Sequence, residues 1–179
     1  MVEAGWDSVR PASRGAVSGI LKFMNDRTVG AKDKYCAHYS RSEIENLAIP
    51  SGAALISIRD PGSERPAARH AEWASVLELQ FHDITSDVPR DEAWWNWWPL
   101  QGYLPPRADH AEEIAGFIRE HWDRTIIVHC EMGLSRSAAV CDILVALGWE
   151  YMETRSEGRR LANRRLIELL LKRLPAEAK

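Results

Sequence analysis

Three segments of the chain have the hydrophobic patterns of β-strands. Residues 76–81 (VLELQF) alternate between apolar and polar side chains, which predicts a strand with one buried face. Residues 53–58 (AALISI) and 125–128 (TIIV) are almost continuously apolar or β-branched, which predicts strands that are buried on both faces. The first of these ends at Asp60-Pro61-Gly62, a turn signal.

Helical patterns lie between and after these strands. Residues 109–122 place apolar side chains on one stripe, and residues 137–147 form a run of helix-forming residues that ends at Gly148. A last helix is expected over residues 157–174, and a short one is expected to begin at Ser40 or Ser42. Strands that alternate with helices predict an α/β fold with a central, mostly parallel sheet flanked by helices.

The junction between residues 125–128 and the helix that follows carries the candidate chemistry. His129 and Cys130 come at the end of the strand, five residues follow, and the helix begins near Arg136. A tight loop between a strand and a helix directs backbone N–H groups into one concavity, in front of a helix N-terminus. The sequence therefore predicts an anion site with Cys130 at its floor.

The residue types at this junction suit nucleophilic chemistry on a phosphate. Cys130 can attack as a thiolate, which neighbouring cations and helix N-termini stabilise, and Arg136 offers a planar fork for two oxygens of an oxyanion. Gly133 permits a positive φ and a close approach of backbone to ligand. Ser137 can hydrogen-bond the sulfur and ease its departure, and His129 can fix the loop. Together they suit attack on a phosphate monoester through a cysteinyl-phosphate.

The stretch HCEMGLSRS at residues 129–137 resembles the HCxxGxxRS signature of the cysteine-dependent protein tyrosine phosphatase superfamily. It is most similar to the compact, dual-specificity-like branch, which has bacterial and phage members. The resemblance extends over residues 53–174 and implies a dual-specificity phosphatase-like fold. It also implies that the phosphate is bound by the loop that contains Glu131, Met132, Gly133, Leu134, Ser135 and Arg136.

The resemblance further implies a general acid, an aspartate in a loop after a strand, which protonates the leaving group. We favour Asp83, because FHDI lies directly after residues 76–81 and the carboxyl ends of parallel strands share one edge of a sheet. Asp87 and Asp91 lie nearer to Cys130 in sequence and stay open as alternatives. Asp109 is a weaker candidate, because its sequence context is that of a helix cap.

The predicted domain organisation has three parts. Residues 1–40 form an N-terminal arm of uncertain structure, open to a loose arm, a short helix or an added strand. Residues 41–179 form the phosphatase domain. Within it, residues 91–106 are an insertion that carries four of the eight tryptophans without a regular amphipathic period. We interpret it first as a loop that packs its own indoles, then as a lid or substrate wall, then as a partner-binding patch.

Composition bounds the partners and the compartment. The net charge of −3 gives no general reason to expect nucleic acid or an anionic membrane as a partner. Cys36, Cys130 and Cys141 form neither a disulfide framework nor a zinc spacing. We therefore expect no metal and no cofactor, and a cytoplasmic location, in which thiols stay reduced.

The predicted function is a phosphate monoester hydrolase that acts on phosphotyrosine, with phosphoserine and phosphothreonine as further candidate substrates. The expected partner is a phosphorylated protein or a small aryl phosphate; the oligomeric state stays open. Glu131 and the absence of lysine between Cys130 and Arg136 argue against inositol lipids. The alternative is a non-catalytic phosphotyrosine-binding module, a pseudophosphatase.

Overall fold

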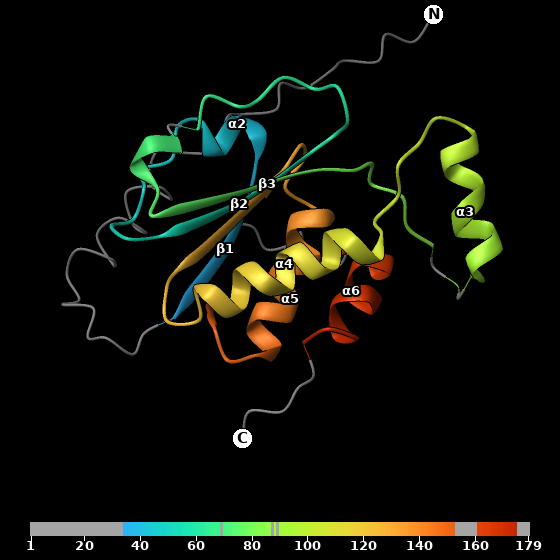
Figure 1. The fold of residues 1–179 in the computed structure, drawn as a ribbon. Coiled ribbons are helices and arrows are strands. Elements are labelled where there is room, and N and C mark those ends of the chain that lie inside the picture. Colours follow the sequence, from blue (N-terminus) through green and yellow to red (C-terminus); the bar gives the residue numbers. More distant parts are fainter. Residues whose placement is uncertain (1–33, 69, 87, 89, 153–160, 175–179) are drawn as a thin grey trace, which may run out of the picture. The chain divides into compact units, whose positions relative to one another are not determined.

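A five-stranded, all-parallel β-sheet organises the described part of the chain (Figure 1). The strand order is β3-β2-β4-β1-β5. The bounds are β1 Tyr35–Ser40, β2 Ala54–Arg59, β3 Ser75–Gln80, β4 Ile126–Cys130 and β5 Glu150–Tyr151. Strand β4, which leads to the candidate loop, therefore lies in the middle of the sheet, between β2 and β1.

The structure is a computed structural model of the 179-residue chain. It describes residues 34–68, 70–86, 88, 90–152 and 161–174. All of these residues belong to one compact unit, Ala31–Lys179. None of the described helices is long and apolar enough to cross a membrane.

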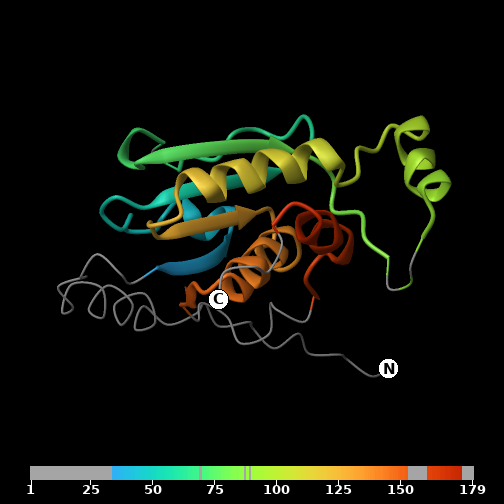
Figure 2. The same cartoon turned by 60° about the horizontal axis from the view of Figure 1, so that its bottom comes forward.

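Helices cover the sheet. Their bounds are α2 Arg41–Ile44, a 3₁₀ turn at His70–Glu72, α3 Glu92–Leu100, α4 Ala108–Glu120, α5 Arg136–Ala146 and α6 Arg164–Leu171. Helices α4, α5 and α6 form a layer over one face of the sheet (Figures 1 and 2). Helix α5 packs on β1 and β4, and α6 packs on α4 and α5. The central part of β4 is fully buried, as its apolar run requires.

The predicted α/β fold with a parallel sheet is confirmed. The three predicted strands are β2, β3 and β4, with bounds that differ by one or two residues, and the predicted helices over 109–122 and 137–147 are α4 and α5. The short helix is α2, with Ser40 in a capping box with Glu43. The last helix is shorter at both ends. It begins after Asn163, whose side chain caps α6 by accepting from Leu166 N, and it ends at Leu171. Residues 157–160 of that prediction lie outside the described residues.

Residues 35–40, which the sequence left inside an arm of uncertain structure, form β1. All six residues are buried, and the strand pairs with β4 and β5. The polar residues of YCAHYS interrupt its apolar pattern, so hydrophobic runs did not predict this strand. Neighbouring segments supply the partners of those polar groups, as the bond of the His38 ring to the Gly133 carbonyl illustrates. The rest of the arm, residues 1–33, lies outside the described residues.

The interpretation of the tryptophan insertion as a loop is wrong for its first part. Residues 92–100 form α3, whose N-cap is Asp91, with its carboxylate accepting from Trp94 N at 2.8 Å. Helical spacing then brings Trp94 and Trp98 together edge to face, with ring centroids 5.4 Å apart. The indoles do pack on one another, as expected, but they do so on a helix.

Candidate active site

Cys130 ends β4 and lies buried at the carboxyl edge of the sheet. Its Sγ is 3.2 Å from Oγ of Ser137, which lies buried in the first turn of α5. The strand therefore delivers the thiol to the helix N-terminus, as the sequence predicted. A hydroxyl at this distance can donate to a thiolate and stabilise its charge.

Hydrogen bonds from other segments to its carbonyl groups hold the loop between Cys130 and α5 in place. Its carbonyls accept from groups on three other segments: Glu131 O from Arg41 N at 3.2 Å, Gly133 O from the His38 ring at 2.9 Å, and Ser135 O from Asn163 N at 3.2 Å. Carbonyls that turn outward leave the intervening N–H groups to turn inward, which is the geometry of an anion-binding nest. The loop thus has the backbone form that binding of an oxyanion requires.

Gly133 has no tolerable substitute at its position. Its φ is +66°, in the left-handed region. A Cβ added there would lie 2.6 Å from the carbonyl carbon of Tyr39 and closer still to Ser40 N. The glycine therefore serves both the turn and the close approach of the loop to the end of β1.

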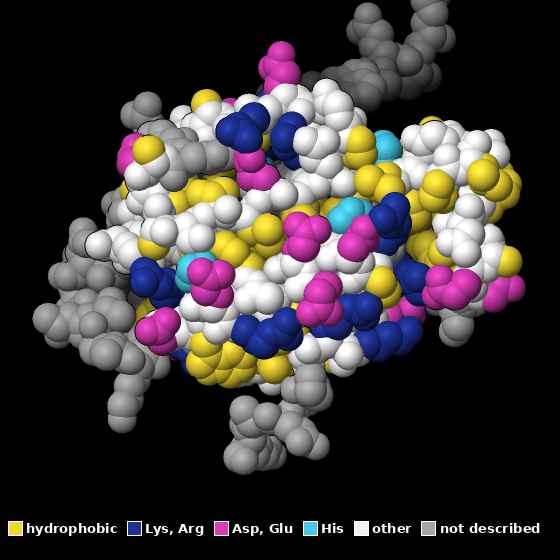
Figure 3. Space-filling view, in the orientation of Figure 1, with side chains coloured by type: hydrophobic (Ala, Val, Ile, Leu, Met, Phe, Trp, Pro, Cys, Tyr) yellow, Lys and Arg dark blue, Asp and Glu magenta, His cyan; other side chains and the backbone are white. Residues whose placement is uncertain are grey.

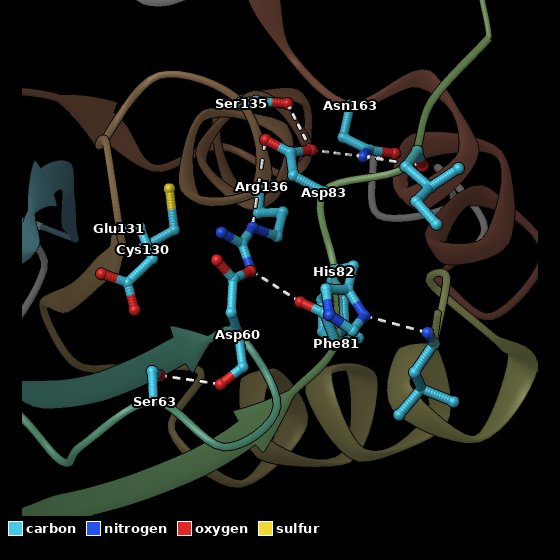
Figure 4. A network of polar contacts seen from close by, with 12 residues as sticks. Asp60, Ser63, Phe81, His82, Asp83, Cys130, Glu131, Ser135, Arg136 and Asn163 are labelled. Carbon is cyan, nitrogen blue, oxygen red and sulfur yellow. Dashed lines mark hydrogen bonds and ion pairs between the residues drawn. The ribbon is translucent and has the colours of Figure 1, made fainter. Parts of the chain in front are cut away.

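Arg136 is 3% exposed, and one corner of its guanidinium is anchored. Its Nη1 donates to Asp60 Oδ1 at 2.7 Å and to the Phe81 carbonyl at 2.6 Å. Its Nε has no hydrogen-bond partner among the described residues. Figure 4 shows the guanidinium between Asp60 and Asp83, with one terminal nitrogen directed to the side where Cys130 lies. The edge opposite the anchored corner is therefore available to grip two oxygens of a ligand.

Asp83 follows β3 and lies beside Arg136. Its Oδ1 accepts from Ser135 Oγ at 2.8 Å and from Asn163 Nδ2 at 2.7 Å, while its Oδ2 is 4.0 Å from Arg136 Nε. Its side chain is 34% exposed. The carboxylate is thus fixed at the mouth of the loop (Figure 4) and is still open to a ligand.

The competing aspartates lie elsewhere or outside the described residues. Asp91 is the N-cap of α3, and Asp109 pairs with Arg107, whose hydrogen bond lowers the pKa of the Asp109 carboxyl. Asp87 lies outside the described residues. Among Asp83, Asp91 and Asp109, only Asp83 has a contact with Arg136.

Of the other candidate residues, His129 is buried and supports the loop, while Glu131, Met132 and Leu134 are at least partly exposed. His129 is buried, and its Nε2 is 2.7 Å from Oγ of Ser57, which joins β4 to β2. Glu131 forms a long ion pair with Arg41, 3.9 Å between Nη1 and Oε2. Met132 is exposed, and Leu134 is half-buried. These two side chains lie at the rim of the loop, so only their backbone is a candidate for contact with an anion.

Three residues that hold the site escaped the sequence analysis. Asp60 lies in the Asp-Pro-Gly turn after β2, Asn163 caps α6, and His38 lies on β1. A polar residue at a strand end and an asparagine before a helix are visible in sequence. Their partners are not visible, because Asp60 and Arg136 are 76 positions apart and Asn163 and Asp83 are 80 apart. Within the described residues, no group of three or more His, Cys, Asp or Glu side chains could hold a metal ion.

No protein-family model matches the chain, and no curated protein does. The crystal structure of Tk-PTP in its active form matches over 84% of this chain and 86% of that chain, with 15% identity and a TM-score of 0.39.

Proposed function

We propose that the chain hydrolyses phosphate monoesters, phosphotyrosine first among them, through a cysteinyl-phosphate. The observation that carries the proposal is the arrangement of the anion site. The thiol of Cys130 and the open edge of Arg136 face one loop whose carbonyls are bound outward. Such a site can hold three non-bridging phosphate oxygens while sulfur approaches the phosphorus.

In the first step the Cys130 thiolate attacks phosphorus, and the bond from phosphorus to the ester oxygen breaks. The leaving phenolate takes a proton from the carboxyl group of Asp83, which must enter the step protonated. The side chains of Ser135 and Asn163 hold that carboxyl group in place. Arg136 and the loop N–H groups stabilise the charge on the transferring phosphoryl group.

In the second step water attacks phosphorus and gives its proton to the Asp83 carboxylate. The sulfur leaves as a thiolate, and the Ser137 hydroxyl, 3.2 Å away, donates to it. The same aspartate thus serves as acid and then as base. Phosphate is released and the enzyme returns to its starting protonation state.

The substrate class follows from the rim of the loop. Glu131 places a carboxylate there, partly balanced by Arg41, so densely charged inositol phosphates are disfavoured. We therefore propose a phosphorylated protein or a small aryl phosphate as substrate, in the manner of a compact dual-specificity-like phosphatase. A cytoplasmic location, in which Cys130 stays reduced, belongs to the same proposal.

The test is hydrolysis of p-nitrophenyl phosphate against pH by wild type, Cys130→Ser and Asp83→Asn, with Asp91→Asn as the matched control. Wild type and Asp91→Asn should turn over, Cys130→Ser should not, and Asp83→Asn should lose the basic limb of a bell-shaped profile. If wild type shows no turnover but still binds tungstate, the protein is a phosphate-binding module and not an enzyme. Turnover by Cys130→Ser would rule out the cysteinyl-phosphate route.

A further inference from the structure

A second hollow lies outside the loop of Cys130, between α3, α6 and the segment that leads into α4. Its volume is about 510 Å³. Residues that line it include Glu92, Trp95, Pro99, Pro105, Pro106 and Arg165. None of residues 130–137 lines it, so it is distinct from the anion site.

Arg165 is the polar group that defines this cavity. Its side chain is 8% exposed, and its guanidinium lies over the Trp95 ring, 4.5 Å from the centroid. Its Nη2 donates to both oxygens of Glu92, at 3.1 and 3.3 Å, while Nε has no partner in the part of the chain that the structure describes. Guanidinium keeps its proton and offers five N–H donors. A buried cation that is satisfied at one nitrogen favours a further acceptor.

Glu92 is a weak competitor for that cation. Its side chain is 69% exposed, so water can solvate the carboxylate as soon as it leaves Arg165. The other basic residue that lines the cavity, Arg107, already pairs with Asp109. An incoming anion that binds Arg165 would therefore have to displace Glu92. Figure 3 shows basic and acidic side chains close together where α3 adjoins the rest of the described chain.

The walls of the cavity are mixed, with Asn96, Arg107 and Asp109 as polar members and an apolar part near Arg165. Trp95, Pro99, Pro105 and Pro106 contribute indole and pyrrolidine surface around the guanidinium. Such walls suit a carboxylate carried on an aliphatic stem more than a bare inorganic anion. Glutamate and aspartate side chains of a peptide have this chemistry.

The cavity is adjacent to the candidate active site along α6. Arg165 comes two residues after Asn163, whose Nδ2 holds Asp83 and whose N–H holds Ser135 O. Asn163 caps α6 and Arg165 lies in its first turn, but side chains two positions apart on a helix do not face the same way. Asn163 is directed to Asp83, and Arg165 is directed to Trp95 and Glu92 of α3.

The cavity also adjoins the segment of the candidate acid, because Leu104 exchanges hydrogen bonds with His82, the residue before Asp83, and precedes Pro105 of the cavity wall. An extended peptide advances about 3.3 Å per residue. This neighbourhood allows an extended peptide bound at the Cys130 loop to enter the cavity with a residue several positions away.

We propose that this cavity recognises an acidic side chain of the substrate, a few residues from the phosphorylated one, through Arg165. The proposal rests on the proposed function for its phosphorylated substrate. It adds a preference for acidic phosphopeptides that the Cys130 loop does not supply.

The experiment uses the full chain with Cys130→Ser, which keeps a bound peptide intact. Fluorescence anisotropy measures its affinity for labelled tyrosine-phosphorylated peptides in which a single glutamate, or a matched glutamine, is moved position by position. At one position or more, glutamate should bind about tenfold more tightly than glutamine, the size of one charge-assisted hydrogen bond. Arg165→Gln should abolish that preference. Arg164→Gln, which removes the same charge from the neighbouring residue, should keep it.

Glu92→Gln protects the test against a folding artefact, because Arg165 is buried and its loss can disturb α3. Without the competing carboxylate, the Glu92→Gln variant should bind the glutamate peptide more tightly than the protein with Glu92 does, and it should bind the glutamine peptide no more tightly. No glutamate preference at any position would overturn the proposal, as would equal losses in Arg165→Gln and Arg164→Gln. Binding to anionic vesicles that depends on Arg165, without peptide preference, would assign the cavity to lipid head groups and overturn it as well.

Turnover of p-nitrophenyl phosphate separates the two proposals. This substrate carries no flanking residues, so its turnover by wild type reports on the Cys130 loop alone. If wild type fails to hydrolyse it, the proposed function fails, while the anisotropy measurement still decides whether the cavity reads an acidic side chain.

Discussion

The hydrogen bond between Asn163 and Asp83 links the last helix to the candidate acid, and its loss should be measurable in both stability and rate. Asn163 is fully buried and has two tasks. Its Oδ1 caps α6 by accepting from Leu166 N at 3.0 Å, and its Nδ2 donates to Asp83 at 2.7 Å and to the Ile84 carbonyl at 3.1 Å. Asn163→Ala removes both tasks, whereas Asn163→Ser keeps a capping hydroxyl and loses the amide donor.

The magnitudes follow from these contacts. Loss of a cap costs about 1 kcal/mol, and loss of a hydrogen bond to a charged group costs about 1.5–3 kcal/mol. Asp83 is one-third exposed, so about 1–2 kcal/mol is the better figure for the second term, since water can replace part of the bond. Asn163→Ala should therefore lower the free energy of unfolding by about 2–3 kcal/mol, and Asn163→Ser should lower it by about 1–2 kcal/mol.

A double-mutant cycle isolates the pair. Urea unfolding of Asn163→Ala, Asp83→Ala and the double variant should give a coupling energy of about 1–2 kcal/mol. The same cycle with Asp91→Ala, the cap of α3, should be additive. In turnover, both Asn163 variants should slow poor leaving groups more than good ones, because the acid is less well positioned. A coupling energy near zero, or equal losses for all leaving groups, would refute this role of Asn163.

Three further predictions concern Gly133, Asp60 and His110. Gly133→Ala should lower the free energy of unfolding by more than the roughly 1–2 kcal/mol that a left-handed conformation costs a residue with a side chain, because the added Cβ clashes with the end of β1. The control is Gly62→Ala, at φ +79° with open space around it, which should lose only that amount. Similar losses for the two variants in urea unfolding would count against the clash. Asp60→Asn should weaken tungstate binding to the resting protein about tenfold by loosening Arg136, as titration calorimetry can measure; unchanged affinity would show that the Phe81 carbonyl alone holds the guanidinium. Burial lowers the pKa of His110, against the charge of Asp109, so the unfolded chain binds that proton more tightly and the free energy of unfolding falls as pH drops below about 6.5. His110→Phe, which keeps the stack on Phe81, should flatten that part of the pH dependence in urea unfolding, and an unchanged slope would exclude His110 as its cause.

Local patterns explain what could be predicted from the sequence. The strands β2, β3 and β4 have runs of apolar or alternating residues, and α4 has one apolar stripe. Each of these signals is complete within its own segment. The signal of the loop after β4 was equally local, because residues 129–137 carry the proposed nucleophile, the glycine and the arginine together.

The remaining features depend on contacts between distant segments. Strand β1 has a histidine, a tyrosine and a serine whose burial depends on neighbours elsewhere in the chain, so no hydrophobic run marks it. The tryptophans of α3 have the spacing i, i+1, i+3 and i+4, which places them on one side of a helix. The sequence analysis did not recognise this pattern, because the segment is short and has Pro99 in its last turn. The capping residue Asp91 was a second available signal. Asp60 and Asn163 join the site only through side chains brought together by the fold.

A cysteinyl-phosphate route requires phosphate on Cys130 during turnover, and mass spectrometry can detect it. Wild type is mixed with p-nitrophenyl phosphate and quenched in acid, and its peptides are examined by mass spectrometry, with Cys130→Ser treated in parallel. We expect a phosphate adduct on the Cys130 peptide at early times, and neither adduct nor turnover in Cys130→Ser. Sustained turnover by wild type with no adduct on Cys130, and undiminished turnover by Cys130→Ser, would contradict the cysteinyl-phosphate route.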